Sequence, residues 1–385
     1  MSSNNKKLAY LAFAMYFITG VICMLIGSSM SSLVEMYGRP IEKIVLFTGA
    51  FAIGRTLSVY LIGKAARKQP LKVLFVCTCM IMAYMLGLVL VPEYYLGFAF
   101  AFLGGVGMSG QDAVCPLFLS RVYPKSYSSV LSAGQALYGL GSFAISALIG
   151  LLFKIHLPFY LANYLLALVG VSMLVLIPFT RWEAQPQRQD EEMLKPLYAS
   201  NHALVLGLLG LICFVYCSGC NSLGSFMSSY IENMGHTAET GSYMLAVYNL
   251  FIVIGSVVFV GLLKKINERT ILVVNSLCIT VALAIGLKVN TLMGYYVSFS
   301  AVGFFLGVLF TIIIAIGTRI EYRNISVVSA LIAMIGSCGD IFTPFVTSRL
   351  VEMKGVTAVF YYVVVLMVIE TIVSVCVYVL TKEEK

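Results

Sequence analysis

The chain has 385 residues, of which 60% are hydrophobic and 11% are charged, and its formal net charge is +8. Soluble proteins carry roughly 25% charged residues, so this composition excludes a soluble protein and indicates an integral membrane protein. The positive charge does not indicate a nucleic-acid-binding protein, because the basic residues gather at the ends of apolar segments.

Twelve apolar segments follow one another along the chain, each long enough to cross a bilayer as a helix of roughly twenty residues. The first follows Lys6 and Lys7 and is too long for the core of a signal peptide, so we expect it to remain as a membrane helix. The predicted helices cover residues 8–34, 44–63, 73–91, 95–120, 129–153, 158–179, 203–230, 242–263, 271–287, 294–318, 326–350 and 356–380.

The basic residues also predict the orientation of these helices. Of the 25 Lys and Arg residues, 18 lie in the two tails and one set of connections, six lie in the other set, and Arg55 lies inside a helix. Cytoplasmic connections carry the excess of Lys and Arg. We therefore expect a multi-pass protein of the cytoplasmic membrane with both termini in the cytoplasm.

The longest polar segment, residues 181–200, divides the chain into halves of six predicted helices each. We predict an amino-terminal bundle of residues 1–180, a cytoplasmic linker of residues 181–200, and a carboxy-terminal bundle of residues 201–385. The expected fold class is thus an all-α membrane protein with twelve transmembrane helices.

The two halves resemble each other. Ile53-Gly54 matches Ile254-Gly255 at an offset of 201 residues, and the segment 129–133 matches 326–330 at an offset of 197. Two six-helix repeats are typical of secondary transporters that work by alternating access, although duplication of any six-helix protein gives the same pattern.

With two six-helix repeats and a basic connection between helices two and three, the chain resembles the major facilitator superfamily. The superfamily motif for that connection is G-x-x-x-D-[RK]-x-G-[RK]-[RK], and Lys64, Arg67 and Lys68 fit it. Gly63 stands where the acid belongs and Ala66 replaces a glycine. The resemblance implies the major facilitator fold and a cytoplasmic gate loop at the three basic residues, without an acid-based latch.

Residues 105–143 are similar to the fucose:proton symporter group of that superfamily. They contain a GxG at 105–107, the pair Gln111-Asp112, Pro116, and Gln135 ahead of a second GxG at 139–141. The acid of that group matches Asp112 or is replaced by Gln111. The group often places a coupling acid in helix one, and residues 8–34 contain none.

Charges inside membrane spans are expensive and mark functional sites. Arg55 and Asp112 are expected at matching depth, each about 12 Å from the cytoplasmic end of its helix, and so could form an ion pair. That pair either holds the first bundle together or exchanges partners with substrate and proton. Asp340 either binds a coupling cation or hydrogen-bonds the helix end freed by Pro344, and Glu370 is given no role.

Neutral polar side chains within the spans suit a hydroxyl-rich ligand better than a charged one. Any one of them could equally form a hydrogen bond between helices. As a set, we expect them to line a substrate cavity together with Asp112: Gln111, Gln135, Tyr138, Tyr216, Asn221 and Asn249.

Enzyme activity, metal sites and cofactors are not expected. The GxGxxG at 105–110 has no preceding strand, so it does not indicate a dinucleotide-binding site. Cys213, Cys217 and Cys220 fall on one face of an apolar helix rather than in a loop that could bind an iron–sulfur cluster. The three histidines lie near span ends, and no Walker A motif occurs.

The sequence therefore predicts a monomeric secondary active transporter that moves a small polar solute, with a sugar-like solute favoured and protons as the coupling ion. One alternative is an exporter of amphipathic compounds, whose cavity should be rich in aromatic residues and Met; the chain has 18 Met. The other is a transporter-like sensor, which usually carries a soluble signalling domain.

Overall fold

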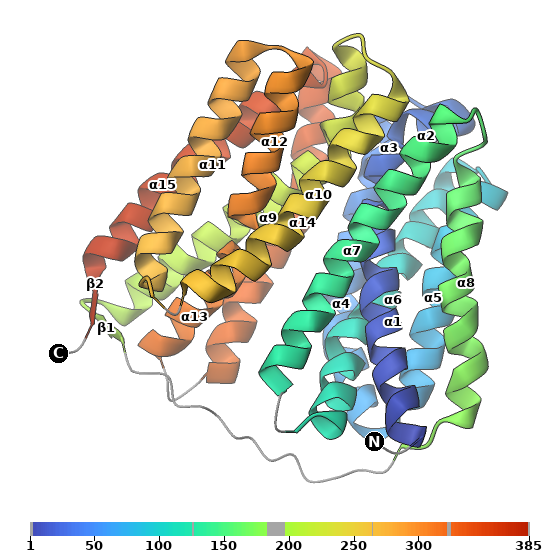
Figure 1. The fold of residues 1–385 in the computed structure, drawn as a ribbon, viewed down its shortest axis with the longest axis horizontal. Helices are drawn as coiled ribbons and strands as arrows, with labels where there is room; N and C mark the ends of the chain where they lie inside the picture. The colour runs from blue at the N-terminus through green and yellow to red at the C-terminus, as the bar shows by residue number, and fades with distance from the viewer. Residues whose placement is uncertain (1–2, 125–126, 183–196, 264, 322–324, 384–385) are drawn as a thin grey trace. The chain divides into compact units, whose positions relative to one another are not determined.

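The computed structural model is almost entirely helical and describes residues 3–124, 127–182, 197–263, 265–321 and 325–383 (Figure 1). The helices of the amino-terminal half are α1 (Ser3–Ser28), α2 (Met30–Tyr37), α3 (Ile41–Ile44), α4 (Leu46–Lys68), α5 (Pro70–Leu90), α6 (Tyr94–Val122), α7 (Tyr127–Lys154), α8 (Tyr160–Leu176) and the 3-10 turn η1 (Ile177–Phe179). Those of the other half are α9 (His202–Asn233), α10 (Ala238–Leu262), α11 (Glu268–Val289), α12 (Leu292–Leu306), α13 (Leu309–Ile320), α14 (Ile325–Lys354) and α15 (Thr357–Leu380).

Eleven helical segments in the described part of the chain are long and apolar enough to cross a membrane. In that set α3 and α4 form one span, as do α12 and α13. α6 is not among the eleven although it has 29 residues. Its glycines and the pair Gln111-Asp112 explain this, because they lower its hydropathy. The prediction of an all-α membrane protein is confirmed.

Two helices that the sequence predicts as continuous are interrupted. The first, predicted over 8–34, breaks at Ser29 between α1 and α2; the Ser29 hydroxyl donates to the Leu25 carbonyl at 2.6 Å, a bond that bends helices. The tenth, predicted over 294–318, is interrupted at Gly307 and Val308 between α12 and α13.

The described chain forms two compact units. The first comprises Met1–Gln189 with Met227–Ala246, and the second comprises Asp190–Phe226 with Val247–Lys385. Most of the predicted linker, residues 183–196, lies outside the described residues.

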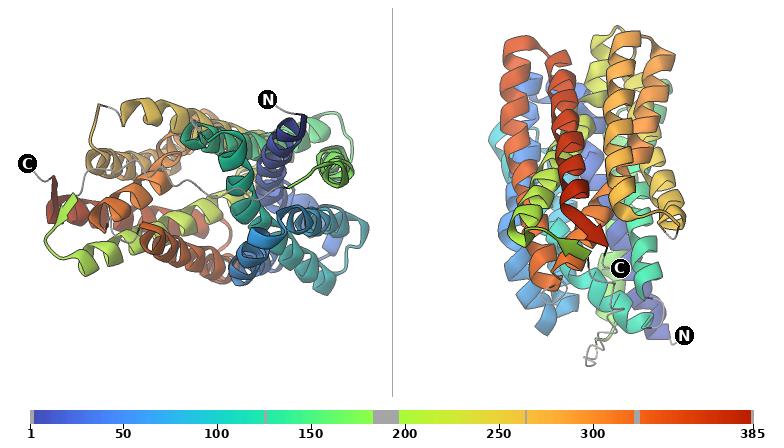
Figure 2. Two further views of the ribbon diagram at one scale, coloured as in Figure 1. Left: turned by 90° about the horizontal axis from the view of Figure 1, so that it is seen from below. Right: turned by 90° about the vertical axis from the view of Figure 1, so that its left-hand side faces the viewer.

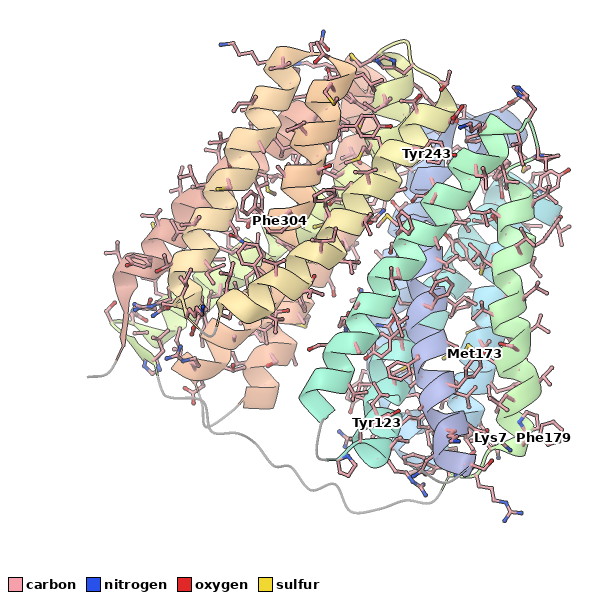
Figure 3. The ribbon with its side chains drawn as sticks, in the orientation of Figure 1. Lys7, Tyr123, Met173, Phe179, Tyr243 and Phe304 are labelled. Atoms are coloured by element: carbon pink, nitrogen blue, oxygen red, sulfur yellow. The ribbon has the colours of Figure 1, made fainter. Side chains whose placement is uncertain are left out.

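In the first unit, the two ends of the amino-terminal half meet at one side. The Lys7 ammonium donates to the Phe179 carbonyl at 2.8 Å, and the backbone N–H of Arg181 donates to the side chain of Asn4 at 2.9 Å (Figure 3). The first helix therefore begins where the last helix of this half ends, as an even number of spans requires.

Helix pairs in the first unit cross at glycines with their backbones in contact. A Cβ atom at Gly54 of α4 would lie closer than 3.0 Å to the Phe102 carbonyl oxygen of α6, and one at Gly105 of α6 would lie equally close to the Phe51 carbonyl oxygen of α4. α1 and α7 cross in the same way, because a Cβ at Gly141 would meet the Phe17 carbonyl oxygen.

The second unit repeats both crossings. A Cβ at Gly255 of α10 would meet the Phe304 carbonyl oxygen of α12, and one at Gly307 would meet the Ile252 carbonyl oxygen (Phe304 is labelled in Figure 3). A Cβ at Gly339 of α14 would likewise meet the Phe214 carbonyl oxygen of α9. The equivalent residues stand 201–202 and 197–198 positions apart, which agrees with the two sequence offsets.

The only strands among the described residues are β1 (Leu197–Ala199) and β2 (Thr381–Glu383), which pair antiparallel beside the carboxyl end of the chain (Figure 2). The Arg269 guanidinium lies 5.5 Å from the ring of Tyr378 and donates to the Thr381 carbonyl. The end of the chain is thereby held against the start of α11.

Candidate functional site

Arg55 of α4 and Asp112 of α6 form the predicted ion pair. The Nε and Nη2 atoms of Arg55 both lie 3.1 Å from Oδ2 of Asp112, so the two donors converge on one carboxylate oxygen. The arginine side chain is 36% exposed and that of the aspartate 29% exposed. The carboxylate is therefore neutralised by its partner while its Oδ1 atom lies outside the two bonds.

The pair joins α4 and α6, whose backbones are in contact at Gly54 and Gly105. The Ser109 hydroxyl donates to the Arg55 carbonyl at 3.1 Å and lies 2.7 Å from the Ser58 hydroxyl. A rigid backbone thus supports two charged side chains that are half-buried.

Gln111 occupies a different place from its neighbour Asp112. Its side chain is only 4% exposed, and the hydroxyl of Thr19 on α1 donates to its amide oxygen. Gln111 therefore connects α6 to α1, which is the interhelical hydrogen bond that the sequence left open as an alternative to cavity lining. Of these two neighbouring residues, Asp112 is the acid and also has the more accessible side chain.

The other proposed cavity residues of the first unit lie on α7. Gln135 is exposed and Tyr138 is half-buried. Ser142, seven residues after Gln135 and so on the same helix face, donates to the Gly20 carbonyl of α1 at 3.1 Å. Gln135 is therefore on a face that is partly turned toward α1.

In the second unit, Tyr216 and Asp340 both interact with the thiol of Cys220. Cys220 is hydrogen-bonded to Tyr216 and lies within electrostatic range of Asp340. Asp340 is half-buried and follows Gly339, whose backbone contacts α9. Asn221 is half-buried and Asn249 is 3% exposed, so these two asparagines differ in access.

The basic residues expected in a gate loop are helical. Lys64, Arg67 and Lys68 are all exposed in the last two turns of α4, which ends at Lys68. A single residue, Gln69, then connects α4 to α5, whose first residue is Pro70. The prediction of a loop starting after residue 63 is wrong, because cations at a helix C-terminus stabilise its dipole and proline is well accommodated at the first position of the next helix.

The structure also contains polar contacts that the sequence did not single out. These are Thr19 against Gln111, Ser58 with Ser109, and the completely buried Glu370 with Ser276. Among the described residues, no group of three or more His, Cys, Asp or Glu is placed to hold a metal ion. Glu370 alone left a signal in the sequence, as a charge inside an apolar segment.

The repeated crossing shows what the second unit has in place of the ion pair. With the offsets of the matching glycines, Arg55 corresponds to Ser256 and Asp112 corresponds to Ile314. The Ser256 hydroxyl donates to the carbonyls of Ile252 at 2.7 Å and Gly307 at 2.9 Å. The same backbone crossing therefore forms without any charge.

Comparison with known proteins gives two relatives that extend over nearly the whole chain. It is 24% identical over 377 residues to the uncharacterized MFS-type transporter YfkL of Bacillus subtilis, covering 94% of this chain and 93% of that protein. It is 21% identical over 370 residues to protein TsgA of Escherichia coli, covering 92% of this chain and 90% of that protein.

Solved structures show the same fold. A mutant of the nucleoside transporter NupG superposes with a TM-score of 0.76 at 10% identity, covering 98% of this chain and 100% of that one. A bacterial homologue of the human lysosomal transporter Spinster, inward-facing and occupied, superposes with a TM-score of 0.72 at 16% identity, covering 99% and 97%. Residues 12–324 match the family model described as Major Facilitator Superfamily. The chain belongs to the Major Facilitator Superfamily of secondary transporters.

Proposed function

We propose that this protein moves a small polar solute, with a sugar-like solute favoured, by alternating access with proton coupling, and that the Arg55–Asp112 pair responds to solute and proton. In this proposal the protein works as a monomer in the cytoplasmic membrane. Both termini and the linker lie in the cytoplasm, between bundles of residues 1–180 and 201–385. The likeness of residues 105–143 to the fucose:proton symporter group supports a sugar-like solute.

The observation that carries this proposal is that the ion pair occurs in only one of two equivalent crossings. If charges were needed to hold α4 against α6, the matching crossing of α10 would need them as well, yet Arg55 and Asp112 correspond there to Ser256 of α10 and Ile314 of α13. Charged groups at membrane depth are costly, so a pair that the packing does not require supports a role in transport.

The geometry of the pair suits exchange. Because both Arg55 donors use Oδ2, a hydroxyl of a solute could donate to Oδ1 of Asp112 without first breaking the pair. If Arg55 turned away, the carboxylate would lose its counter-charge, and binding a proton would remove that cost. Of these two events, only the binding of a proton changes the charge of the site.

The test replaces the pair with the residues of the other repeat. The double substitution Arg55→Ser with Asp112→Ile should give a folded protein, because the second unit has Ser256 and Ile314 at the corresponding positions. Ser256→Ala, in the equivalent position of the second unit, is the matched control. A thermal-shift screen over sugars, amino acids, organic acids and drugs first identifies a solute, and counterflow in proteoliposomes then measures transport.

We expect the control to transport the solute and the double variant to lose it. Unchanged counterflow and affinity in the double variant would refute a role for the pair. A solute that stabilises the wild-type protein without counterflow would instead support the sensor alternative, and a preference for apolar drugs would support the exporter.

A further inference from the structure

Glu370 is a carboxylic acid buried in the second unit, and no positive partner for it occurs among the residues that the structure describes. It is the only charged residue among the 24 residues of α15. Its side chain is completely buried, with an exposure of 0%. It faces α11, with which α15 packs. Neither the helix crossings nor the proposed substrate site uses this side chain.

The neighbours of its carboxyl group are hydroxyls. Oε1 lies 3.2 Å from Oγ of Ser276, which is in turn 3.4 Å from Oγ of Ser374. One turn further along α11, Thr280 and Thr371 form a second hydroxyl pair at 3.1 Å. Oε2 has no hydrogen-bond partner among the residues that the structure describes.

The hydroxyl of Ser276 has two acceptors within reach, the Leu272 carbonyl and Oε1 of Glu370, and the carbonyl is the closer one. Its hydroxyl donates to the Leu272 carbonyl of its own helix at 2.8 Å, which is shorter than its 3.2 Å separation from Glu370. A hydroxyl has one proton, so Ser276 then presents only lone pairs to the carboxyl group. An ionised carboxylate has no proton to share, whereas a protonated one donates its O–H to Ser276.

The charged and titratable groups around Glu370 also favour a protonated carboxyl group. From α11 it faces the hydroxyl of Ser276, and from α9 the thiol of Cys220 lies within electrostatic range. Asp340 of α14 interacts with that same thiol. The ion pairs described in this unit are Arg319–Glu268, Arg349–Glu352 and His202–Glu321, and none includes Glu370.

A purely structural role does not account for an acid here. A serine or glutamine would give α15 a hydrogen bond to Ser276 without burying an ionisable group, and a glutamine amide would supply donors as well as an acceptor. The unmatched Oε2 shows that this state does not use the full bonding capacity of the group. The thiol of Cys220 connects it to Tyr216, one of the residues expected to line the cavity, and to Asp340.

We propose that Glu370 is a proton-binding site of the second unit, protonated in this state and deprotonated at another step of transport. Release leaves a carboxylate and delivers one proton to the water of the transport pathway on the Cys220 and Asp340 side. The coupling role rests on the proposed transport function, while the protonation itself does not.

Infrared spectroscopy tests the protonation without a known solute. A protonated carboxyl group has a carbonyl stretching band that a carboxylate lacks, and Glu370→Gln removes the band of this residue alone. We expect that band in the wild-type protein, its loss at high pH, and its absence from Glu370→Gln. Glu352→Gln is the control, since Glu352 is exposed and ion-paired in the same unit. Glu370→Asp, which should move the band rather than remove it, serves if Glu370→Gln does not fold.

Transport tests the exchange. Glu370→Gln mimics the protonated acid, so it should keep counterflow and lose uptake driven by a pH gradient, whereas Glu352→Gln should keep both. A missing band at every pH, or a band that never disappears while the wild-type protein couples protons, overturns the proposal. If the wild-type protein moves no solute, the proposed function fails, but the infrared titration still decides whether Glu370 gains and loses a proton.

Discussion

Removing the charge of Asp112 should destabilise the first unit through Arg55. Asp112→Asn keeps the shape and a hydrogen-bonding oxygen, but it leaves the guanidinium without a counter-charge. At a separation of 3.1 Å and an effective dielectric constant of about 20, the attraction is about 5 kcal/mol before the cost of desolvation. Exposed pairs contribute about 0–1 kcal/mol and breaking buried pairs costs about 3–5 kcal/mol. Since both side chains are about one-third exposed, we expect a coupling of about 1–3 kcal/mol.

A double-mutant cycle measures that coupling. Asp112→Asn and Arg55→Gln are compared with the double variant by unfolding in detergent, followed with a thiol-reactive dye that reports exposure of the buried thiols Cys77 and Cys115. The double variant should lose less free energy of unfolding than the sum of the losses in the two single variants. Glu352→Gln breaks an exposed pair and should change stability by at most about 0.5 kcal/mol. Additive effects of the two single changes, within about 0.5 kcal/mol, would refute the pairing.

Three further predictions concern packing, orientation and coupling. Gly105→Val should prevent folding because its side chain would meet the α4 backbone, whereas Gly63→Ala, with nothing within 4 Å, should fold normally; yield of monodisperse protein checks both. A single cysteine in place of Arg188, in a cysteine-free background, should resist an impermeant thiol reagent added outside intact cells, and labelling would reverse the proposed orientation. Asp112→Asn should keep counterflow but lose uptake driven by a pH gradient; if Asp340→Asn shows this pattern instead, Asp340 carries the proton, and if neither does, another residue or ion does.

The membrane spans and the ion pair could be predicted because each depends on distance along the chain. Span length follows from apolar content, and the rise of a helix fixes the depth of every residue. Equal distances from the predicted helix ends at residues 63 and 120 placed Arg55 and Asp112 at one level before any contact was known, although α4 continues to Lys68 and α6 to Val122. The exact ends of α4 could not be read in this way, because a helix continues through basic residues as readily as a loop does.

Contacts that depend on the rotation of a helix about its axis could not be predicted. Gln111 and Asp112 are adjacent in sequence, yet one faces α1 and the other faces α4. Thr19 gives no sequence signal, because a hydroxyl in an apolar helix can always bond to its own backbone. Glu370 was recognisable as an unusual charge, but its partner Ser276 lies 94 residues away on another helix.

The glycine crossings have a consequence for experiments that follow the transport cycle. Where two backbones touch, as at Gly54 and Gly105, neither helix can slide or rotate without moving the other. Spectroscopic labels placed across α4 and α6 would therefore report one fixed separation in every state of the protein. Such a label pair is an internal standard, against which a changing distance measured elsewhere can be assigned to real motion. The same contact leaves no room for a small molecule between the two backbones at Gly54 and Gly105.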